Sequence, residues 1–280
     1  MTPDTYLRPE AFARERRAIF ANEWLIVGRG AKVAEAGNYL AISYGGWSVI
    51  AVRDGRGRLG AFQNICRHQG LPVLDGGSGN CASLKCRYHG WTYDLDGRFL
   101  SASPLSMPAD PADPMHNLRP AQVAEWNGLV LVNFNDKAAA LTGIELFETT
   151  ARQLAGLEIQ DEVAVAIDAN WKVALEHTLA SAVDMFWVWP NLVVQRAGAA
   201  IVIHEIAPVT FKRTRVVRHL YAASGGPTAA ARGETEQAGE IQKSAANAAQ
   251  LAYEGGAPLP APTGLVEAFR ARLRGVHPAG

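Results

Sequence analysis

Cys66-Arg67-His68, followed after seventeen residues by Cys86-Arg87-Tyr88-His89, decides how the first half of the chain is interpreted. Each part of the pattern supplies one thiolate and one imidazole, which are ligands for soft and borderline metals. Short β-rich runs separated by Gly, Asp and Asn turns surround both parts, so the two ligand pairs are expected on two loops of a small antiparallel β domain.

Two metal centres agree with this residue set. Two cysteines and two histidines can hold one tetrahedral zinc ion. One Cys and one His from each of two loops instead favours a 2Fe–2S cluster, with both thiolates on one iron and both imidazoles on the other. Neutral imidazoles raise the potential of such a cluster to about −150 to +300 mV, from near −400 mV with four thiolates. The remaining alternative is four unrelated side chains in turns. We expect a cluster bound by Cys66, His68, Cys86 and His89.

Composition narrows the class of protein. The 280 residues carry 27 Lys and Arg against 27 Asp and Glu, and this zero net charge gives no reason to expect a nucleic acid partner. No apolar run reaches the roughly 18 residues of a membrane span, and the N-terminal residues lack an export pattern. We therefore predict a cytoplasmic protein without a membrane partner. Three cysteines argue against a disulfide framework, and Cys81 is expected in the core.

The pattern of the chain predicts an α+β protein of two domains, residues 1–140 and 141–280. The first has a helical arm over 9–22, then short strands with a Gly45-Gly46 hairpin turn, and a loop over 101–116. The second is expected to contain helices over 143–156, 171–186, 233–253 and 263–274, a strand over 163–167, and a hairpin formed by 201–206 and 209–221.

NICRHQG (64–70) and CRYHGWTYDLDGR (86–98) resemble the Rieske motif of the large subunits of Rieske non-haem iron oxygenases. RPEAFARERRAIFANEWLIVGR (8–29), LGAFQNICRH (59–68) and EWNGLVLVNF (125–134) are similar to the same half of that family. The resemblance implies an antiparallel β domain of the iron–sulfur-protein type. It also implies that Cys66 and Cys86 bind one iron of a Rieske 2Fe–2S cluster, and that His68 and His89 bind the solvent-facing iron. Gln69 and Arg87 depart from the family's usual Arg and Pro.

The family's second domain, which has a helix-grip-like α+β fold, binds one ferrous iron through two His and one carboxylate. The resemblance continues through Asn170-Trp171-Lys172-Val173, but the ligand positions differ. Asp184 and Trp189 stand where the two His are expected, and Ser181 replaces the carboxylate that links the two redox centres. Gln242 and Lys243 fall where the third ligand is expected, and the segment before them is short. We expect a truncated domain that lacks the mononuclear iron.

A rebuilt iron site is the alternative for this domain. His177, Asp184, His204 and His219, with Glu205, are its candidate ligands. His177 and Asp184 are seven residues apart and would share one face of a helix. Alternatively, these are ordinary polar residues with hydrogen-bond partners inside the fold.

Three functions remain open. The resemblance favours an electron-transfer and structural subunit of a hetero-oligomeric oxygenase, in a trimer-type ring with a catalytically complete large subunit. That subunit would receive the electrons at its mononuclear iron, and a reductase or ferredoxin would supply them. The second possibility is a self-sufficient oxygenase with a rebuilt iron site. The third is a stand-alone ferredoxin-like carrier, although a carrier needs only the first half of the chain.

Overall fold

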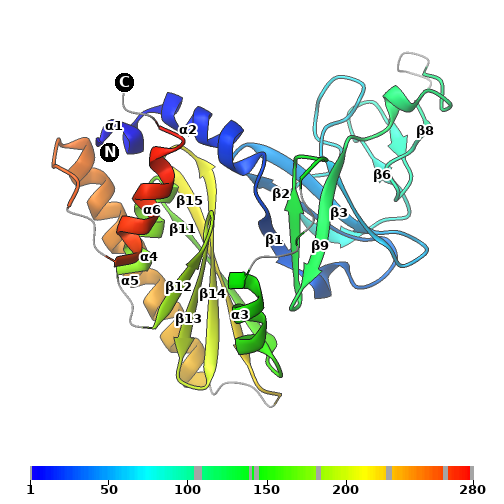
Figure 1. The fold of residues 1–280 in the computed structure, drawn as a ribbon. Coiled ribbons are helices and arrows are strands. Elements are labelled where there is room, and N and C mark those ends of the chain that lie inside the picture. The colour runs from blue at the N-terminus through cyan, green and yellow to red at the C-terminus, as the bar shows by residue number, and fades with distance from the viewer. Residues whose placement is uncertain are drawn as a thin grey trace. The chain divides into compact units, whose positions relative to one another are not determined.

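Two compact units make up the computed structural model (Figure 1). The β-rich unit comprises residues 20–141, and the mixed unit comprises residues 1–19 together with 142–280. The structure describes residues 2–103, 109–138, 141, 145–180, 184–224, 229–260 and 264–277. Among the described helices, none is long and apolar enough to cross a membrane.

The β-rich unit is built on a seven-stranded antiparallel sheet in the order β1-β10-β9-β4-β3-β2-β5. Its strands are β1 (Leu25–Arg29), β2 (Asn38–Tyr44), β3 (Trp47–Arg53), β4 (Leu59–Gln63), β5 (Gly77–Asn80), β9 (Pro120–Trp126) and β10 (Leu129–Asn133), with the 3-10 turn η2 (Gly30–Val33) after β1. Gly45 and Gly46 join β2 to β3 with positive φ angles of 57° and 81°, which L-residues other than glycine rarely adopt. Tyr44 pairs with Trp47 across this turn, so the predicted hairpin is confirmed.

A second, three-stranded sheet completes this unit and carries one of the two predicted ligand loops. It consists of β6 (Leu84–Lys85), β7 (Thr92–Tyr93) and β8 (Phe99–Ser101), and the short turn η3 (Pro114–His116) follows it. One buried cluster joins the two sheets and includes both predicted cysteine ligands. Its members are Ala41, Ile50, Val52, Phe62, Cys66, Val73, Leu84, Cys86, Trp91, Tyr93, Phe99 and Leu118. The ligand loops therefore start from the core.

The mixed unit is a five-stranded antiparallel sheet in the order β11-β15-β14-β13-β12, packed against helices. Its strands are β11 (Glu158–Ile167), β12 (Met185–Val188), β13 (Leu192–Ala197), β14 (Ala200–Thr210) and β15 (Arg213–Ala222), and its helices are α3 (Glu145–Leu154), α4 (Trp171–Ala180), α5 (Ala229–Glu254) and α6 (Gly264–Arg274). Helix α4 packs against β14 and β15, and also against α5 and α6, while α5 covers β11.

The N-terminal arm differs from the expectation of one domain over 1–140. Helices α1 (Asp4–Leu7) and α2 (Pro9–Glu15) belong to the mixed unit, whereas η1 (Arg16–Phe20), a π-helical segment, leads into the β-rich unit. The reason is a set of buried polar contacts. The Tyr6 hydroxyl lies 2.5 Å from Oε1 of Glu176. The Glu15 carboxylate accepts hydrogen bonds from Lys172 Nζ and Trp171 Nε1, both at 2.7 Å.

The predicted helix over 171–186 is too long. Helix α4 ends at Ala180, and residues 185–188 form strand β12 instead. β12 pairs with β13 from Met185 opposite Gln195 to Val188 opposite Leu192. Cross-strand pairing gives these apolar side chains neighbours on a pleated surface, which outweighs the helical periodicity of the preceding segment.

Candidate metal centre

The first predicted ligand loop follows β4 and is closed by short-range backbone hydrogen bonds. The Cys66 N–H donates to the Leu71 carbonyl at 2.7 Å, and the Gly70 N–H donates to the Cys66 carbonyl at 2.9 Å. Gly70 has a φ of 77°, so this tight closure needs a residue without a Cβ. Asn64 anchors the base of the loop, because its Oδ1 accepts the N–H groups of Val73 and Leu74, both at 2.9 Å.

The second loop, between β6 and β7, repeats this construction. The Cys86 N–H donates to the Trp91 carbonyl and the Gly90 N–H donates to the Cys86 carbonyl, both at 2.9 Å. Gly90 has a φ of 68°. In both loops the backbone carbonyl of the cysteine accepts a hydrogen bond from a glycine four residues later, and that glycine has a positive φ angle. The sequence therefore builds two matching turns, each presenting one thiol and one imidazole.

The four predicted ligands form two pairs. The Nδ1 atoms of His68 and His89 lie 3.2 Å apart, with the ring planes at 85°. Nitrogen atoms at that separation fit two corners of a tetrahedron around a metal about 2.0 Å from each, the usual metal–imidazole distance. Cys66 and Cys86 are buried, at 2% and 1% exposure. Burial raises the pKa of the Cys66 thiol, so a thiolate there needs a cationic partner.

Tyr93 and Trp91 support this centre from β7 and the end of its loop. The Tyr93 hydroxyl accepts the Arg67 N–H at 3.0 Å and lies 3.3 Å from the Cys66 sulfur. Burial, together with the Cys66 thiol, raises the pKa of Tyr93, so the hydroxyl keeps its proton and can donate it to that sulfur. The Trp91 indole stacks on the His68 ring with 5.2 Å between centroids and 16° between planes. It thereby shields one face of the imidazole from water.

The donor set fits two metal atoms better than one. A closed zinc site needs four converging donors. A half-buried imidazole pair and a buried thiol pair instead match the two ends of a binuclear cluster.

The positions at which the resemblance predicted iron ligands in the mixed unit lie in different surroundings. Asp184 has an exposed side chain, 3.7 Å from Nη1 of Arg196. Trp189 packs edge-on against Trp187 and has the Arg272 guanidinium 5.2 Å from its ring centroid. Ser181 lies outside the described residues.

The third position is occupied by a polar cluster at the junction of α4, α5 and β15. The Gln242 amide donates to the hydroxyl of Thr178, and its Oε1 accepts from the Arg218 guanidinium. Arg218 is 2% exposed, and burial lowers its pKa to about 10. This cluster places the Arg218 guanidinium beside Gln242, where the resemblance predicted the third iron ligand, and the sequence pattern gave no sign of Arg218.

The other candidate ligands have partners of their own. The Nε2 atom of His204 lies 2.9 Å from Oε1 of Gln195, and burial lowers the pKa of His204 to about 3. The Nε2 atom of His219 lies 3.4 Å from Oε2 of Glu205. His177 lines a cavity of about 180 Å³ together with Glu176 and other side chains. The structure does not bring His177, His204 and His219 to one point among its described residues.

Comparison with known families gives a match for the segment that contains the two ligand loops. Residues 23–111 match the model of the Rieske [2Fe-2S] domain. The chain carries a Rieske domain. The matched segment contains both ligand loops and all three strands of the small sheet. Tyr93 also lies in this domain, although the sequence analysis did not predict a role for it. Side chains alternate between the two faces of a strand, so the β pattern at Thr92 and Tyr93 could have indicated that one of them points into the core.

Curated relatives extend the likeness past the Rieske domain. The oxygenase subunit of glycine betaine monooxygenase from Chromohalobacter salexigens is 38% identical over 178 residues, which are 61% of this chain and 39% of that protein. Choline monooxygenase from Beta vulgaris is 31% identical over 192 residues, 65% of this chain and 43% of that protein. The matches therefore span about two fifths of these relatives.

Solved structures share the fold over nearly the whole chain. The apo form of CntA, a quaternary ammonium Rieske monooxygenase, superposes with a TM-score of 0.82 at 20% identity, over 99% of this chain and 95% of that chain. Naphthalene 1,2-dioxygenase from Rhodococcus sp. gives 0.63 at 18% identity, over 98% and 82%. The α+β class is confirmed. Coverage this complete gives no support to the expectation of a truncated second domain.

Proposed function

We propose that Cys66, His68, Cys86 and His89 bind a Rieske 2Fe–2S cluster, and that the chain is an electron-transfer and structural subunit of a Rieske oxygenase. Its electrons would go to the mononuclear iron of a catalytically complete large subunit. A reductase or ferredoxin would supply them. The observation that carries this proposal is the presence, on two matching loops, of an imidazole pair with 3.2 Å between its Nδ1 atoms and a buried thiol pair.

The residues around the ligands have separate tasks in this proposal. A Rieske cluster bound here supplies a one-electron couple between about −150 and +300 mV. The two loops hold the ligands through their backbone hydrogen bonds, and Trp91 excludes water from one face of His68. Because the Nδ1 atoms face each other, the Nε2–H edges of both half-buried rings are left for a carboxylate of the partner.

The cluster formed by Gln242, Thr178 and Arg218 supports the part of the proposal that assigns the mononuclear iron to a partner. A buried guanidinium repels a divalent cation strongly, since the low dielectric of the interior screens charges poorly. Gln242 brings no charge to offset it. The contacts of Asp184 with Arg196 and of Trp189 with Arg272 add two more cationic neighbours at the family's ligand positions.

A second candidate function is a self-sufficient oxygenase. The fold that covers 95% of the CntA chain and the relatives described as oxygenase subunits favour it. The names of these relatives point to small quaternary ammonium compounds as substrates of the assembly, whichever chain holds the iron. A stand-alone carrier has less support, because the mixed unit has a buried core of its own.

Metal and sulfide analysis of the purified chain tests the proposal. We expect two iron atoms and two acid-labile sulfides per chain, with a reduced-state EPR signal, after anaerobic incubation with Fe(II) and desalting. Cys86→Ala should lose the cluster, while Cys81→Ala, which changes the cysteine outside the pattern, should keep it. Zinc in place of iron, or an intact cluster in Cys86→Ala, would refute the ligand assignment. A third iron with substrate-dependent oxygen consumption would favour the self-sufficient oxygenase.

A further inference from the structure

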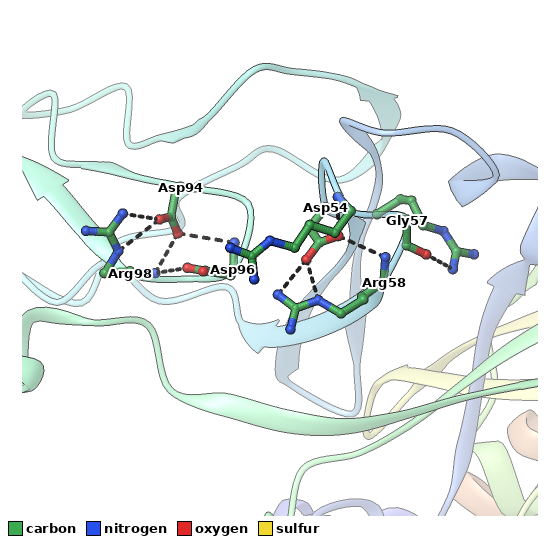
Figure 2. Close-up of polar contacts among 8 residues, drawn as sticks. Asp54, Gly57, Arg58, Asp94, Asp96 and Arg98 are labelled. Carbon is green, nitrogen blue, oxygen red and sulfur yellow. Dashed lines mark hydrogen bonds and ion pairs between the residues drawn. The ribbon is translucent and has the colours of Figure 1, made fainter.

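Two turns of the Rieske domain have the same sequence pattern and the same hydrogen bonds. They are Asp54-Gly55-Arg56-Gly57-Arg58 and Asp94-Leu95-Asp96-Gly97-Arg98. In each turn the first aspartate accepts backbone N–H groups two and four residues later, and the last arginine returns to the same carboxylate (Figure 2). The Asp54 N–H and the Asp94 N–H each donate at 2.9 Å to the carbonyl of the arginine.

The paired carboxylates lie behind the guanidinium groups. The Arg58 and Arg98 side chains are 61% and 62% exposed, whereas those of Asp54 and Asp94 are 10% and 24% exposed. Backbone hydrogen bonds also engage the two carboxylates, and those bonds lower the pKa of Asp54. A partner approaching from solvent therefore meets guanidinium groups, although each is paired within its own turn.

Both turns face the same groove, whose volume is about 740 Å³. Arg58 and Arg98 line it together with Arg67 and Arg119, and Met115 is exposed at its edge. Asp96 is the acidic side chain among the lining residues. Within the described part of the chain, no hydrogen bond or ion pair with another residue engages the Arg119 side chain. The groove thus presents four guanidinium groups around an apolar floor of Phe62 and Leu118.

One wall of the groove is continuous with the ligand loops. Arg67 stands between Cys66 and His68, and its Nε–H donates to the Met115 carbonyl at 3.1 Å. The next residue, His116, contacts the edge of the Trp91 ring at 5.4 Å between centroids, and Trp91 stacks on His68. An occupant of the groove would therefore contact Arg67, which is next to the predicted ligand His68 in the sequence.

We propose that this groove docks the protein that delivers electrons to the chain, through a carboxylate-rich surface of that donor. The proposal rests on the proposed function, since it assumes that the cluster is present. Complementary charge between the groove and an acidic donor suits the brief encounter in which one protein reduces another. Such interfaces are small and transient, and complementary charge sets their association rate more than their affinity. An open groove with exposed arginines attracts a broad acidic surface more readily than it encloses a single small anion.

The test measures cluster reduction by two reductants in stopped flow, with the purified holo-protein. The first is a reduced plant-type ferredoxin, used as the acidic protein probe. The second is photoreduced lumiflavin, a small neutral probe. We expect the ferredoxin rate constant to fall steeply between 20 and 500 mM salt. Arg119→Glu should lower it about tenfold or more at low salt, within the usual range of electrostatic steering. Arg119→Lys should keep most of the rate.

Arg56→Glu is the matched control, because Arg56 is exposed in the first turn but does not line the groove. It should change the ferredoxin rate less than twofold, and no variant should change the lumiflavin rate. Equal effects of Arg56→Glu and Arg119→Glu, or a salt-independent ferredoxin rate, would overturn the proposal. So would a change in oligomeric mass on Arg119→Glu, which would make the groove a contact between copies. Absence of a cluster would instead defeat the proposed function.

Discussion

Tyr93 is the side chain most directly placed to tune the proposed cluster, because its hydroxyl lies 3.3 Å from the Cys66 sulfur. In a cluster bound here, reduction would increase the negative charge around that sulfur, and a hydrogen bond donated by Tyr93 would stabilise the reduced state. A net hydrogen bond of about 0.5–1.5 kcal/mol corresponds to roughly 20–60 mV for one electron.

We therefore expect Tyr93→Phe to lower the midpoint potential by about 20–60 mV in a redox titration. Tyr88→Phe is the control, since Tyr88 is 47% exposed and its hydroxyl contacts Arg87 at 3.5 Å. A potential that falls equally in both variants would show that the Tyr93 hydroxyl does not act on the sulfur.

His204 gives a residue-scale prediction for pH. Its folded-state pKa is about 3, below an ordinary value near 6.5, because burial disfavours the imidazolium. Below pH 6.5 the unfolded chain binds a proton that the folded chain does not, so the free energy of unfolding falls as the pH falls toward 3. Between pH 7.5 and 5.5 this residue alone should lower the free energy of unfolding by about 1 kcal/mol.

Urea unfolding at the two pH values, in the wild type and in His204→Gln, measures this contribution. The variant should lose about 1 kcal/mol less than the wild type on acidification. An identical loss in both proteins would mean that His204 is protonated in the folded state at pH 5.5.

Elements whose contacts are local in sequence were the predictable ones. The β2–β3 hairpin follows from Gly45-Gly46, and each ligand loop closes within five residues of its cysteine. The cluster of Arg218, Gln242 and Thr178 joins residues 24 and 64 positions apart, so no spacing pattern signals it. Strand β12 is different, because its pairing with β13 is local, from Val188 opposite Leu192 to Met185 opposite Gln195, but the helical pattern of the preceding segment concealed it.

The twin turns allow a matched test of packing at one element. Gly57 and Gly97 occupy the same turn position with φ of 77° and 83°, but only at Gly97 would a Cβ meet the Phe62 ring, at 2.4 Å. Gly57→Ala should cost about 1 kcal/mol from backbone strain, and Gly97→Ala about 1–3 kcal/mol more from the clash. Chemical denaturation monitored by the cluster absorbance measures both. Equal losses would mean that Phe62 moves aside freely.

At the scale of the whole molecule, buried charged side chains connect the N-terminal arm to the rest of the mixed unit. Lys172 and Glu15 are fully buried and 2.7 Å apart, and His277 Nε2 lies 2.7 Å from the same carboxylate. A buried pair that loses one partner leaves an uncompensated charge, at a cost of about 3–5 kcal/mol.

Glu15→Gln should therefore lower the free energy of unfolding by about 3–5 kcal/mol. Glu10→Gln, an exposed change on the same helix, should stay within about 0.5 kcal/mol. Urea denaturation followed by tryptophan fluorescence suits the measurement, because Trp171 donates to Glu15. Similar stabilities of the two variants would show that water or the neutral amine compensates Lys172.

Because residues 1–19 belong to the mixed unit, the polypeptide enters and leaves the Rieske domain through that unit, once on each side of 20–141. A single backbone cut at either crossing leaves the other crossing intact. If the backbone is cleaved after residue 141, the C-terminal fragment still binds the N-terminal arm through the hydrogen bonds of Tyr6 and Glu15. Two covalent connections therefore join the Rieske domain to the mixed unit, and a single proteolytic cleavage does not release it.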